Sequence, residues 1–424
     1  MMSTHRCDTY YTQLYNTFDT TRLSLKEEED ESHGTSVCPI HKKMASFIVL
    51  NAFRRKKQGT SSTMLSLYSS STIKASFRSS IPPLRSPPPS LSVGSLIRFE
   101  KRDHSTVAAC GGVSMNHGSS SQVAEPFFRS VLGQMETVYL NRNPTPRSVL
   151  ELVRSVDDDQ LCYDHLAFRT FGIGGYGIDS LASFFLDYGY TQMDELRFPA
   201  KKLRALWFAP PHASAAVPGG SGVDGPLPRV FISELLVDQM STQTQDVIRR
   251  YTETSPNGRK YAALSSALGS LPWGKPLSSE FEQLARESEY AAWTLANGYA
   301  LNHVTISVHR LKSHLNKIKK LNQFLEEKGF KLNSEGGVLK VSPDGGLLQS
   351  STVADSLSFK FSDGVTKYIP CSYIEFAERL VLPQFQNVPE SDIKECHRRD
   401  GFEVGNADKI FESTNQEQLS RRTG

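Results

Sequence analysis

The sequence predicts an α+β fold in which two βαβββ modules form one curled sheet, with added helices. The first observation behind this prediction is an internal repeat, in which residues 164–169 (DHLAFR) align with residues 302–307 (NHVTIS). Two further pairs of segments follow in the same order, FFLDYGY with FLEEKGF and VFISELL with SYIEFAER. The second observation is that each copy shows strand-like alternation, then helical spacing, then more strands. Two similar halves of one sheet are therefore expected.

Composition fits a folded protein and excludes several functional classes. Of the 424 residues, 38% are hydrophobic and 22% are charged, so most of the chain can bury a core. The net charge of +3 gives no electrostatic reason to expect a nucleic-acid partner. No apolar run approaches the roughly 18 residues that cross a bilayer, so no membrane partner is expected. The six cysteines lack CxxC spacing, which indicates free thiols rather than a disulfide framework or a structural zinc site.

The first part of the chain, residues 1–119, has the composition of an organellar transit peptide. Residues 32–99 contain no Asp or Glu and are rich in Ser, Arg, Lys and Pro. The acidic run EEEDE at residues 27–31 does not fit this pattern, so the targeting segment could begin later, at Met44 or Met64. We expect a plastid location, in a chloroplast or amyloplast, after cleavage of this segment.

Residues 120–424 are expected to form a single catalytic domain that begins with two helices, at 123–141 and 145–156. The first module, about residues 160–239, starts with the alternating segment YDHLAFRTF, which predicts a strand. A helix follows and is capped by Gly189. Three further strands are expected, in the segments DELRFP, KLRALWFAP and PRVFISELLVD.

A mostly helical insert, about residues 240–298, separates the two modules and ends at Gly298 as a C-cap. The second module, about residues 299–382, repeats the strand (ALNHVTISV) and the helix (LNKIKKLNQFLEEKGF). Further strands are predicted in GGVLKV, LSFKFSDG and KYIPCSYIEFAERL. Residues 383–424 form a C-terminal segment.

Three metal-competent side chains occupy matching faces of these strands. Side chains alternate along a strand, so His165, His303 and Glu375 each lie opposite an apolar face that would meet the helices. If the two halves of the sheet close around one cavity, two imidazoles and one carboxylate converge there. This donor set is the facial triad, which suits Fe(II) and leaves positions open for substrate and dioxygen.

Arg169 shares the face of His165 four residues further along the strand, about 13 Å away at roughly 3.3 Å per residue. A guanidinium that reaches back would meet a carboxylate roughly 6–7 Å from the metal, near the length of a six-carbon dicarboxylate. Arginine binds carboxylates in bidentate fashion. This spacing permits, without requiring, a small 2-oxo dicarboxylic acid as the substrate, and a structural ion pair of Arg169 is the alternative.

Each of these residues also has a purely structural reading. A single buried histidine is more often a hydrogen-bonded core residue than a ligand, and only the matching positions in two repeats favour ligation by His165 and His303. Glu234 stands in the first copy at the apparent place of Glu375 and is the rival ligand. The glycine-rich segment GIGGYG, residues 172–177, follows a strand but lacks the GxGxxG spacing, so we interpret it as a turn.

Long motifs throughout the expected catalytic domain resemble those of a known family. DHLAFRTFG, ELRFPAKKLRALWFAPP, YAAWTLANGYALNHVTISV and DGFEVGNADKIFEST are similar to the 2-oxoadipate dioxygenase/decarboxylase family, particularly its plant plastid members, and the modules resemble those of the vicinal-oxygen-chelate superfamily. The resemblance implies conversion of 2-oxoadipate and O2 to (R)-2-hydroxyglutarate and CO2, a step of lysine catabolism. It implies iron ligands at His165, His303 and Glu375, with substrate contacts at these two histidines, Arg169 and Val404.

Two other functions remain open from the sequence. A glyoxalase-like lyase or isomerase on the same fold would use Glu234 as a fourth ligand and need no dioxygen. A plastid binding protein that has lost turnover is the third possibility, which the retention of all three ligands and Arg169 disfavours. Aerobic, Fe(II)-dependent release of CO2 from 2-oxoadipate would distinguish the first function from the other two.

Overall fold

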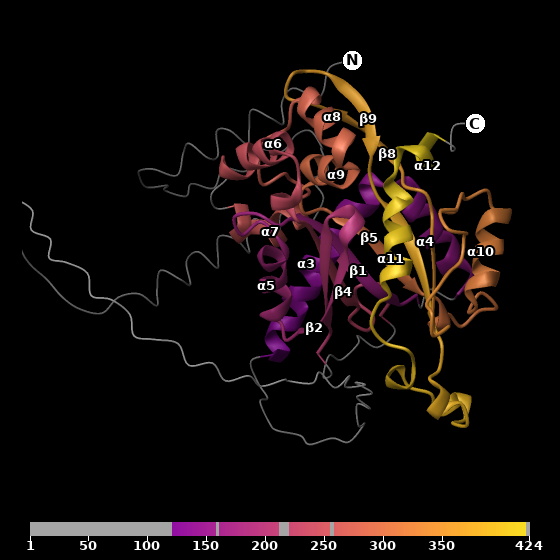
Figure 1. The fold of residues 1–424 in the computed structure, drawn as a ribbon. Coiled ribbons are helices and arrows are strands. Elements are labelled where there is room, and N and C mark those ends of the chain that lie inside the picture. Colours follow the sequence, from indigo (N-terminus) through magenta and orange to yellow (C-terminus); the bar gives the residue numbers. More distant parts are fainter. Residues whose placement is uncertain (1–120, 158–160, 212–219, 255–257, 421–424) are drawn as a thin grey trace, which may run out of the picture. The chain divides into compact units, whose positions relative to one another are not determined.

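The computed structural model describes residues 121–157, 161–211, 220–254 and 258–420. The predicted transit segment, residues 1–119, lies outside the described residues. No helix within the described ranges is long and apolar enough to cross a membrane. The described chain is an α+β fold built on one curled, mixed sheet of eight strands (Figure 1).

The sheet has the strand order β2-β3-β4-β1-β5-β10-β7-β6, which is the same path taken twice. In each half the first strand runs parallel to the last one, β1 to β4 and β5 to β10, and an antiparallel β1–β5 pair joins the halves. The first half contains β1 (Tyr163–Phe171), β2 (Thr191–Phe198), β3 (Leu203–Ala209) and β4 (Arg229–Leu235). The second contains β5 (Leu301–Ser307), β6 (Lys340–Val341), β7 (Leu347–Ser351) and β10 (Tyr373–Arg379).

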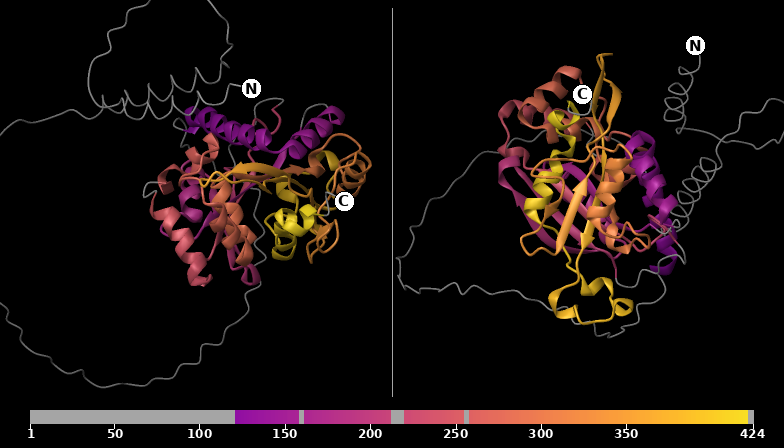
Figure 2. Two further views of the ribbon diagram at one scale, coloured as in Figure 1. Left: turned by 90° about the horizontal axis from the view of Figure 1, so that it is seen from above. Right: turned by 90° about the vertical axis from the view of Figure 1, so that its right-hand side faces the viewer.

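Helices cover both faces of this sheet (Figure 2). On one face lie α3 (Ser121–Arg142) and α4 (Pro144–Val156), and on the other lies α11 (Val404–Phe411). Leu166, Val304 and Ile374 belong to the apolar set that is buried on these strands, as the alternation predicts. The remaining helices are α5 (Ile178–Leu186), α6 (Thr242–Glu253), α7 (Ala262–Leu268), α8 (Ser278–Glu287), α9 (Glu289–Asn297), α10 (Ile318–Glu327) and α12 (Gln416–Ser420).

The two module helices, α5 and α10, begin and end in the same way. The first backbone N–H of each helix donates to a carboxylate, Ile178 to Glu234 (2.9 Å) and Ile318 to Glu378 (2.8 Å). These acidic groups satisfy an otherwise free donor and favour the positive end of the helix dipole. Each helix is followed by a glycine with a φ of 86°, which side-chain-bearing residues rarely adopt. The predicted pairing of FFLDYGY with FLEEKGF is therefore confirmed.

The predicted equivalence of Glu234 and Glu375 is wrong. In the parallel strand pairs, Glu375 lies opposite Thr305 in the second half, and the corresponding partners in the first half are Phe231 and Ala167. Glu234 instead matches Glu378, three residues beyond Glu375, and both carboxylates bind a helix N-terminus. Matching the letters of VFISELL and SYIEFAER placed the acidic residues together, whereas strand register separates them.

The second half also departs from the predicted strands. The segment LSFKFSDG contributes β8 (Ser356–Lys360), which pairs only with β9 (Thr366–Pro370) in a separate two-stranded sheet. Its place in the main sheet is taken by β7, in a segment that was not predicted as a strand. Short segments such as LLQSS carry too little alternation to indicate which of two neighbouring segments joins the sheet.

Candidate metal centre

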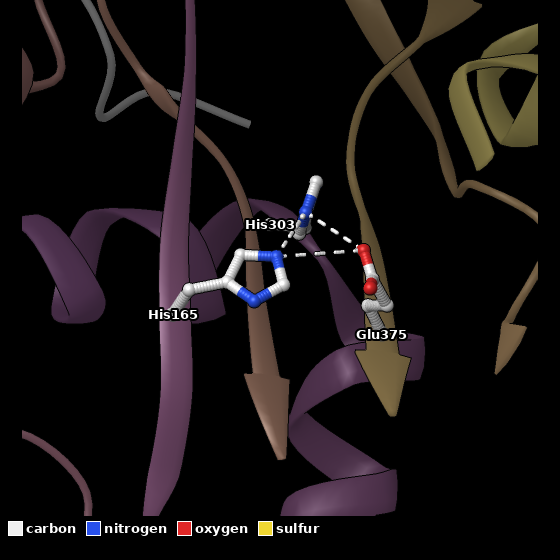
Figure 3. Close-up of side chains that lie close together, drawn as sticks. All are labelled: His165, His303 and Glu375. Atoms are coloured by element: carbon white, nitrogen blue, oxygen red, sulfur yellow. Dashed lines mark hydrogen bonds and ion pairs between the residues drawn. The ribbon is translucent and has the colours of Figure 1, made fainter. Parts of the chain in front are cut away.

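His165, His303 and Glu375 come from three adjacent strands, β1, β5 and β10, and converge on one point (Figure 3). His303 Nε2 lies 3.0 Å from Glu375 Oε2 and 3.4 Å from His165 Nε2, and the third edge, His165 Nε2 to Glu375 Oε2, is 3.6 Å. All three side chains are buried. The predicted convergence of these residues is confirmed, and His165, His303 and Glu375 could together hold a metal ion.

The donor set fits a metal of the kind predicted. Ligand atoms about 2.0–2.2 Å from an ion, on one face of an octahedron, lie about 3 Å from each other, which is close to the three edges observed. Two imidazole nitrogens and one carboxylate oxygen suit a divalent first-row transition metal and leave the opposite side for other ligands. A buried carboxylate is costly unless it is paired, and a bound cation would pair with Glu375 here.

Each histidine is oriented by the residue before it. His165 Nδ1 lies 2.9 Å from Asp164 Oδ2, and His303 Nδ1 lies 3.0 Å from Asn302 Oδ1. The register of the β1–β5 pair shifts at these two places, so that Asp164 and Asn302 are each the extra residue of a β-bulge. A bulge turns a side chain that would point to the opposite face back toward its neighbour. The Nδ1–H of each ring thereby finds an acceptor, and Nε2 faces the centre of the cluster. Thr305 Oγ1 also lies 3.0 Å from His165 Nε2.

Asp164 is in turn held by a buried arginine. Arg379 donates to Asp164 through Nε (2.6 Å) and Nη2 (2.9 Å), and both side chains are fully buried. Arg229 approaches the same carboxylate at 3.6 Å. Although burial opposes ionisation, the positive charge of Arg379 holds the pKa of Asp164 well below its ordinary value. A fixed negative charge thus lies behind His165, whereas a neutral amide lies behind His303.

The orientation of the Glu375 carboxylate is fixed by a hydrogen bond to Oε1, the oxygen that does not face the two histidines. Gln349 Nε2 donates to Glu375 Oε1 (2.6 Å), and Gln349 accepts from Asn406 of α11 (3.0 Å). Burial raises the pKa of Glu375, but His165 and His303 outweigh it and lower the pKa to about 2. Burial lowers the pKa of His303. Burial also opposes the charged form of His165, but Glu375 and Asp164 outweigh it and raise the pKa of His165. The cluster is therefore an ionised carboxylate with at least one neutral imidazole.

Arg169, on the same strand as His165, is buried without a carboxylate partner among the described residues. Its guanidinium lies over the rings of Trp293, Tyr290 and Phe411, with its central carbon 5.0, 5.1 and 5.7 Å from their centroids. Its Nη2 donates to Thr414 Oγ1 (3.1 Å), and in the described ranges it forms no ion pair with an acidic side chain. The structural ion pair considered from the sequence is therefore absent. An aromatic cage around an unpaired guanidinium is suited to an anionic ligand.

Two cavities meet at Phe411. The inner one, about 20 Å³, is lined by the three candidate ligands together with Phe231, Gln349, Tyr373, Phe402, Ala407, Ile410 and Phe411. The outer one, about 250 Å³, has Arg169, Tyr290 and Phe411 in its wall, and Lys201, Lys202 and Glu412 also line it. The inner cavity is about the size of one water molecule. Phe411 lines both the cavity at the candidate metal centre and the larger one.

The other predicted residues lie elsewhere. Val404 is the first residue of α11, is 40% exposed and lines neither cavity. Glu234 accepts from Arg204 Nε (2.5 Å) as well as from Ile178, and the predicted turn GIGGYG wraps around it, since a Cβ on Gly177 would collide with its carboxylate. Glu234 is thus a helix cap rather than a rival ligand.

Sequence reasoning missed Asp164, Asn302, Gln349, Tyr373 and Phe411. One signal was available for the first two, since both precede a candidate ligand at matching positions of the repeat. Strand alternation also puts Tyr373 on the face of Glu375, although no role was predicted for it. Gln349 and Phe411 are placed only by strand pairing and by the return of the C-terminal segment.

Comparison with known proteins identifies the group to which this chain belongs. The family model of the 2-oxoadipate dioxygenase/decarboxylases matches residues 131–390. The chloroplastic 2-oxoadipate dioxygenase/decarboxylase of Arabidopsis thaliana is 82% identical over 373 residues, which is 85% of this chain and 100% of that protein. The chloroplastic/amyloplastic enzyme of Oryza sativa subsp. japonica is 65% identical over 300 residues, 71% of this chain and 82% of that protein.

A solved structure agrees with these relatives. The crystal structure of the hydroxyglutarate synthase from Oryza sativa in complex with 2-oxoadipate has a TM-score of 0.71 and 63% sequence identity, covering 74% of this chain and 100% of that one. A match over most of the described fold, at this level of identity, decides the family. The chain belongs to the 2-oxoadipate dioxygenase/decarboxylase family.

Proposed function

We propose that the cluster of His165, His303 and Glu375 holds Fe(II), and that the protein converts 2-oxoadipate and O2 to (R)-2-hydroxyglutarate and CO2 at this centre. The enzyme is a 2-oxoadipate dioxygenase/decarboxylase by family. The observation that carries the choice of site is the mutual approach of the three donor atoms, 3.0–3.6 Å apart, next to a buried arginine that lacks a carboxylate. The two halves of the sheet act as vicinal-oxygen-chelate-type modules that curl around the metal.

Bound ferrous iron would supply the electrons with which dioxygen is activated, and its open side would accept the oxygens of a 2-oxo acid. The chain's own residues prepare this side. Asp164 and Asn302 fix the ring orientation of the two histidines, and Gln349 fixes Glu375. Phe231, Phe402 and Ile410 line the space next to the donors and exclude bulk water.

Arg169 would bind the carboxylate of the substrate that is remote from the metal. Its positive charge is already desolvated, so a bidentate carboxylate replaces lost water without a further burial penalty for the guanidinium. The backbone of Arg169 lies about 13 Å along the strand from that of His165, and the long arginine side chain covers part of this distance. This arrangement favours a dicarboxylic 2-oxo acid, in agreement with the 2-oxoadipate bound to the relative from Oryza sativa.

Entry of this substrate requires a rearrangement near Phe411. The inner cavity of about 20 Å³ is too small for a six-carbon acid, whereas the outer cavity of about 250 Å³ is large enough. Displacement of the Phe411 side chain would join the two. Val404 is exposed and lines neither cavity, so its contact with the substrate stays a prediction.

The proposed domain boundaries follow the two halves of the sheet. We assign residues 160–239 and 299–382 to the two modules, residues 240–298 to the helical insert and residues 383–424 to the C-terminal segment that covers the site, all within one catalytic domain, 120–424. The protein is plastidial, like its chloroplastic and chloroplastic/amyloplastic relatives. Residues 1–119 would act as the transit segment.

The glyoxalase-like alternative has no supporting observation. It requires a fourth ligand from Glu234, whose carboxylate is engaged by Arg204 and by the N-terminus of α5. The position equivalent to Glu375 in the first half is Phe231, which cannot bind a metal. We therefore propose redox chemistry rather than metal-assisted isomerisation.

Anaerobic reconstitution with Fe(II), followed by addition of O2 and 2-oxoadipate, tests this function. One O2 should be consumed for each CO2 released, and isotopically labelled dioxygen should place both of its atoms in hydroxyglutarate, because the departing carboxylate carries its own two oxygens. Glu375→Ala should abolish turnover and iron retention, whereas Glu378→Gln, on the same strand but outside the cluster, should keep both. Turnover with Zn(II) or Ni(II) in the absence of O2 would contradict the proposal.

A further inference from the structure

Tyr373 lies beside the candidate ligands with an unused hydroxyl. Its side chain is fully buried, lines the inner cavity and stacks on His303 with ring centroids 4.7 Å apart and planes inclined by 28°. The Tyr139 hydroxyl donates to the backbone carbonyl of Tyr373 and fixes the strand there. Among the described residues, however, the Tyr373 hydroxyl itself has no hydrogen-bond partner. A buried hydroxyl without a partner is unfavourable, and such groups are uncommon outside ligand sites.

A second unpartnered donor lies on the same side of the sheet. Arg169 Nε is buried and also lacks a hydrogen-bond partner among the described residues. The Tyr373 hydroxyl approaches the guanidinium of Arg169, and the Tyr373 ring stacks on His303, so the guanidinium and the hydroxyl border one region next to the metal ligands. In any contact between the two, the guanidinium donates to the phenolic oxygen, so the Tyr373 O–H still lacks an acceptor. A guanidinium and a hydroxyl that face one region are complementary to an anion with several acceptor positions.

The rest of the inner cavity offers little polar recognition. Phe231, Phe402, Ile410 and Phe411 contribute apolar surface, and the amide of Gln349 is already bonded to Glu375 and Asn406. A carboxylate has about four acceptor positions, of which a bidentate guanidinium fills two. A phenolic O–H can fill a third. In an otherwise apolar space, a few placed donors decide which ligand binds.

We propose that Tyr373 is a specificity-determining residue whose hydroxyl donates to the same substrate carboxylate that Arg169 binds, the one remote from the metal. This inference rests on the proposed function and adds a residue to it. Its consequence is selection: a 2-oxo acid with a second carboxylate gives the Tyr373 hydroxyl an acceptor and the Arg169 charge a partner, whereas a monocarboxylic 2-oxo acid of equal length provides neither. Sites built to hydrogen-bond a polar group reject analogues that lack it.

Substitution Tyr373→Phe removes the hydroxyl and keeps the ring that stacks on His303. With the iron-loaded protein, KM for 2-oxoadipate should rise about 10- to 100-fold with little change in kcat, the effect of one lost hydrogen bond to a charged group. KM for 2-oxohexanoate, the monocarboxylic analogue, should stay within about twofold, because that substrate never used the hydroxyl. Anaerobic calorimetric titration with the two acids should give the same ratio of affinities without turnover.

A second tyrosine provides the matched control. Tyr176 is also buried, but its hydroxyl donates to the Thr252 carbonyl (2.6 Å), away from both cavities. Tyr176→Phe should lower Tm by a few degrees and leave the preference between the two acids unchanged. Tyr373→Phe should show the reverse pattern, an altered preference with no loss of Tm.

An unchanged preference in Tyr373→Phe, or equal losses for both acids, would overturn this inference and leave Tyr373 as a packing partner of His303. Such a result would not affect the proposed function, provided that the unsubstituted protein consumes O2 with 2-oxoadipate. If the unsubstituted protein does not, the proposed function itself fails.

Discussion

The two halves of the sheet follow the same path but contribute differently to the site. Each half places one histidine at the third residue of its first strand, His165 on β1 and His303 on β5, and each orients that histidine from a β-bulge. Beyond this the halves diverge. The second half supplies Glu375 where the first has Phe231, and the first supplies Arg169 on the strand whose counterpart carries Ser307. A duplicated frame therefore yields one half that completes the metal centre and one that binds the substrate carboxylate.

This comparison explains why the centre has three protein ligands. Had both halves kept a carboxylate, four donors would surround the ion and less of it would be open to substrate and dioxygen. The aromatic ring of Phe231 fills the position of the missing carboxylate and packs on Phe402, with ring centroids 5.0 Å apart. The asymmetry can be tested by exchanging residues between the halves.

The largest effect is expected when the second half is made to resemble the first. Glu375→Phe removes the only carboxylate donor of the cluster and leaves Gln349 without its acceptor. Iron content after desalting and turnover of 2-oxoadipate should both fall by more than about 100-fold. Metal analysis and oxygen consumption measure these losses, and retained iron would show that the three donors do not act as one site.

Making the first half resemble the second should have an opposite effect on metal retention. Phe231→Glu introduces a carboxylate at the position that corresponds to Glu375. We expect slower metal loss to a chelator together with a fall in kcat of about 100-fold, because a fourth ligand would occupy the open side. Phe231→Gln, which has a similar shape and no charge, serves as the control and should not slow metal loss.

The next effect concerns Arg169, whose position in the second half is occupied by Ser307. Arg169→Ala should keep iron and raise KM for 2-oxoadipate about 100-fold or more, since it removes two charge-assisted hydrogen bonds. Arg169→Lys should recover only part of the loss, because an ammonium cannot form the bidentate pair. Steady-state kinetics beside iron analysis separates the two roles, and an unchanged KM would refute the assigned one.

A smaller effect is expected from the bulge residues. Asp164→Asn gives the first half the neutral acceptor of the second, and it also leaves the buried charge of Arg379 without its partner. Iron affinity should fall about 10- to 100-fold, the range found when the residue behind a ligand histidine is changed. Asn302→Ala removes the equivalent acceptor without exposing a buried charge. Competition with a chelator compares the two, and equal losses would show that charge at this position is unimportant.

The smallest effect is expected at the two helix caps, where the halves are most alike. Glu234→Gln and Glu378→Gln should each lower the free energy of unfolding by about 1 kcal/mol, since each weakens a charged cap on a helix N-terminus. Iron content should not change in either variant. Urea unfolding measures the stabilities, and loss of iron in Glu234→Gln alone would revive Glu234 as a ligand.

The sequence anticipated the features that depend on local pattern. Alternation along YDHLAFRTF and ALNHVTISV places His165 and His303 opposite an apolar face, and this follows from strand geometry alone. The spacing of the repeat predicted two helices with glycine ends, which α5 and α10 have. The identity of the three candidate ligands was also available, because few residue types bind metals.

Other features depend on contacts between distant segments, and no local pattern encodes them. The register of β4 and β10 decides that Phe231, not Glu234, corresponds to Glu375, because parallel neighbours are aligned by the whole sheet rather than by matching letters. The bulges at Asp164 and Asn302 exist only in the β1–β5 pair. Phe402, Ile410 and Phe411 reach the inner cavity only because the C-terminal segment returns to the sheet, and Tyr373 lies beside His303 because β10 pairs with β5. The residue types thus determined which chemistry is possible, whereas tertiary packing decided which of these side chains lie together at one site.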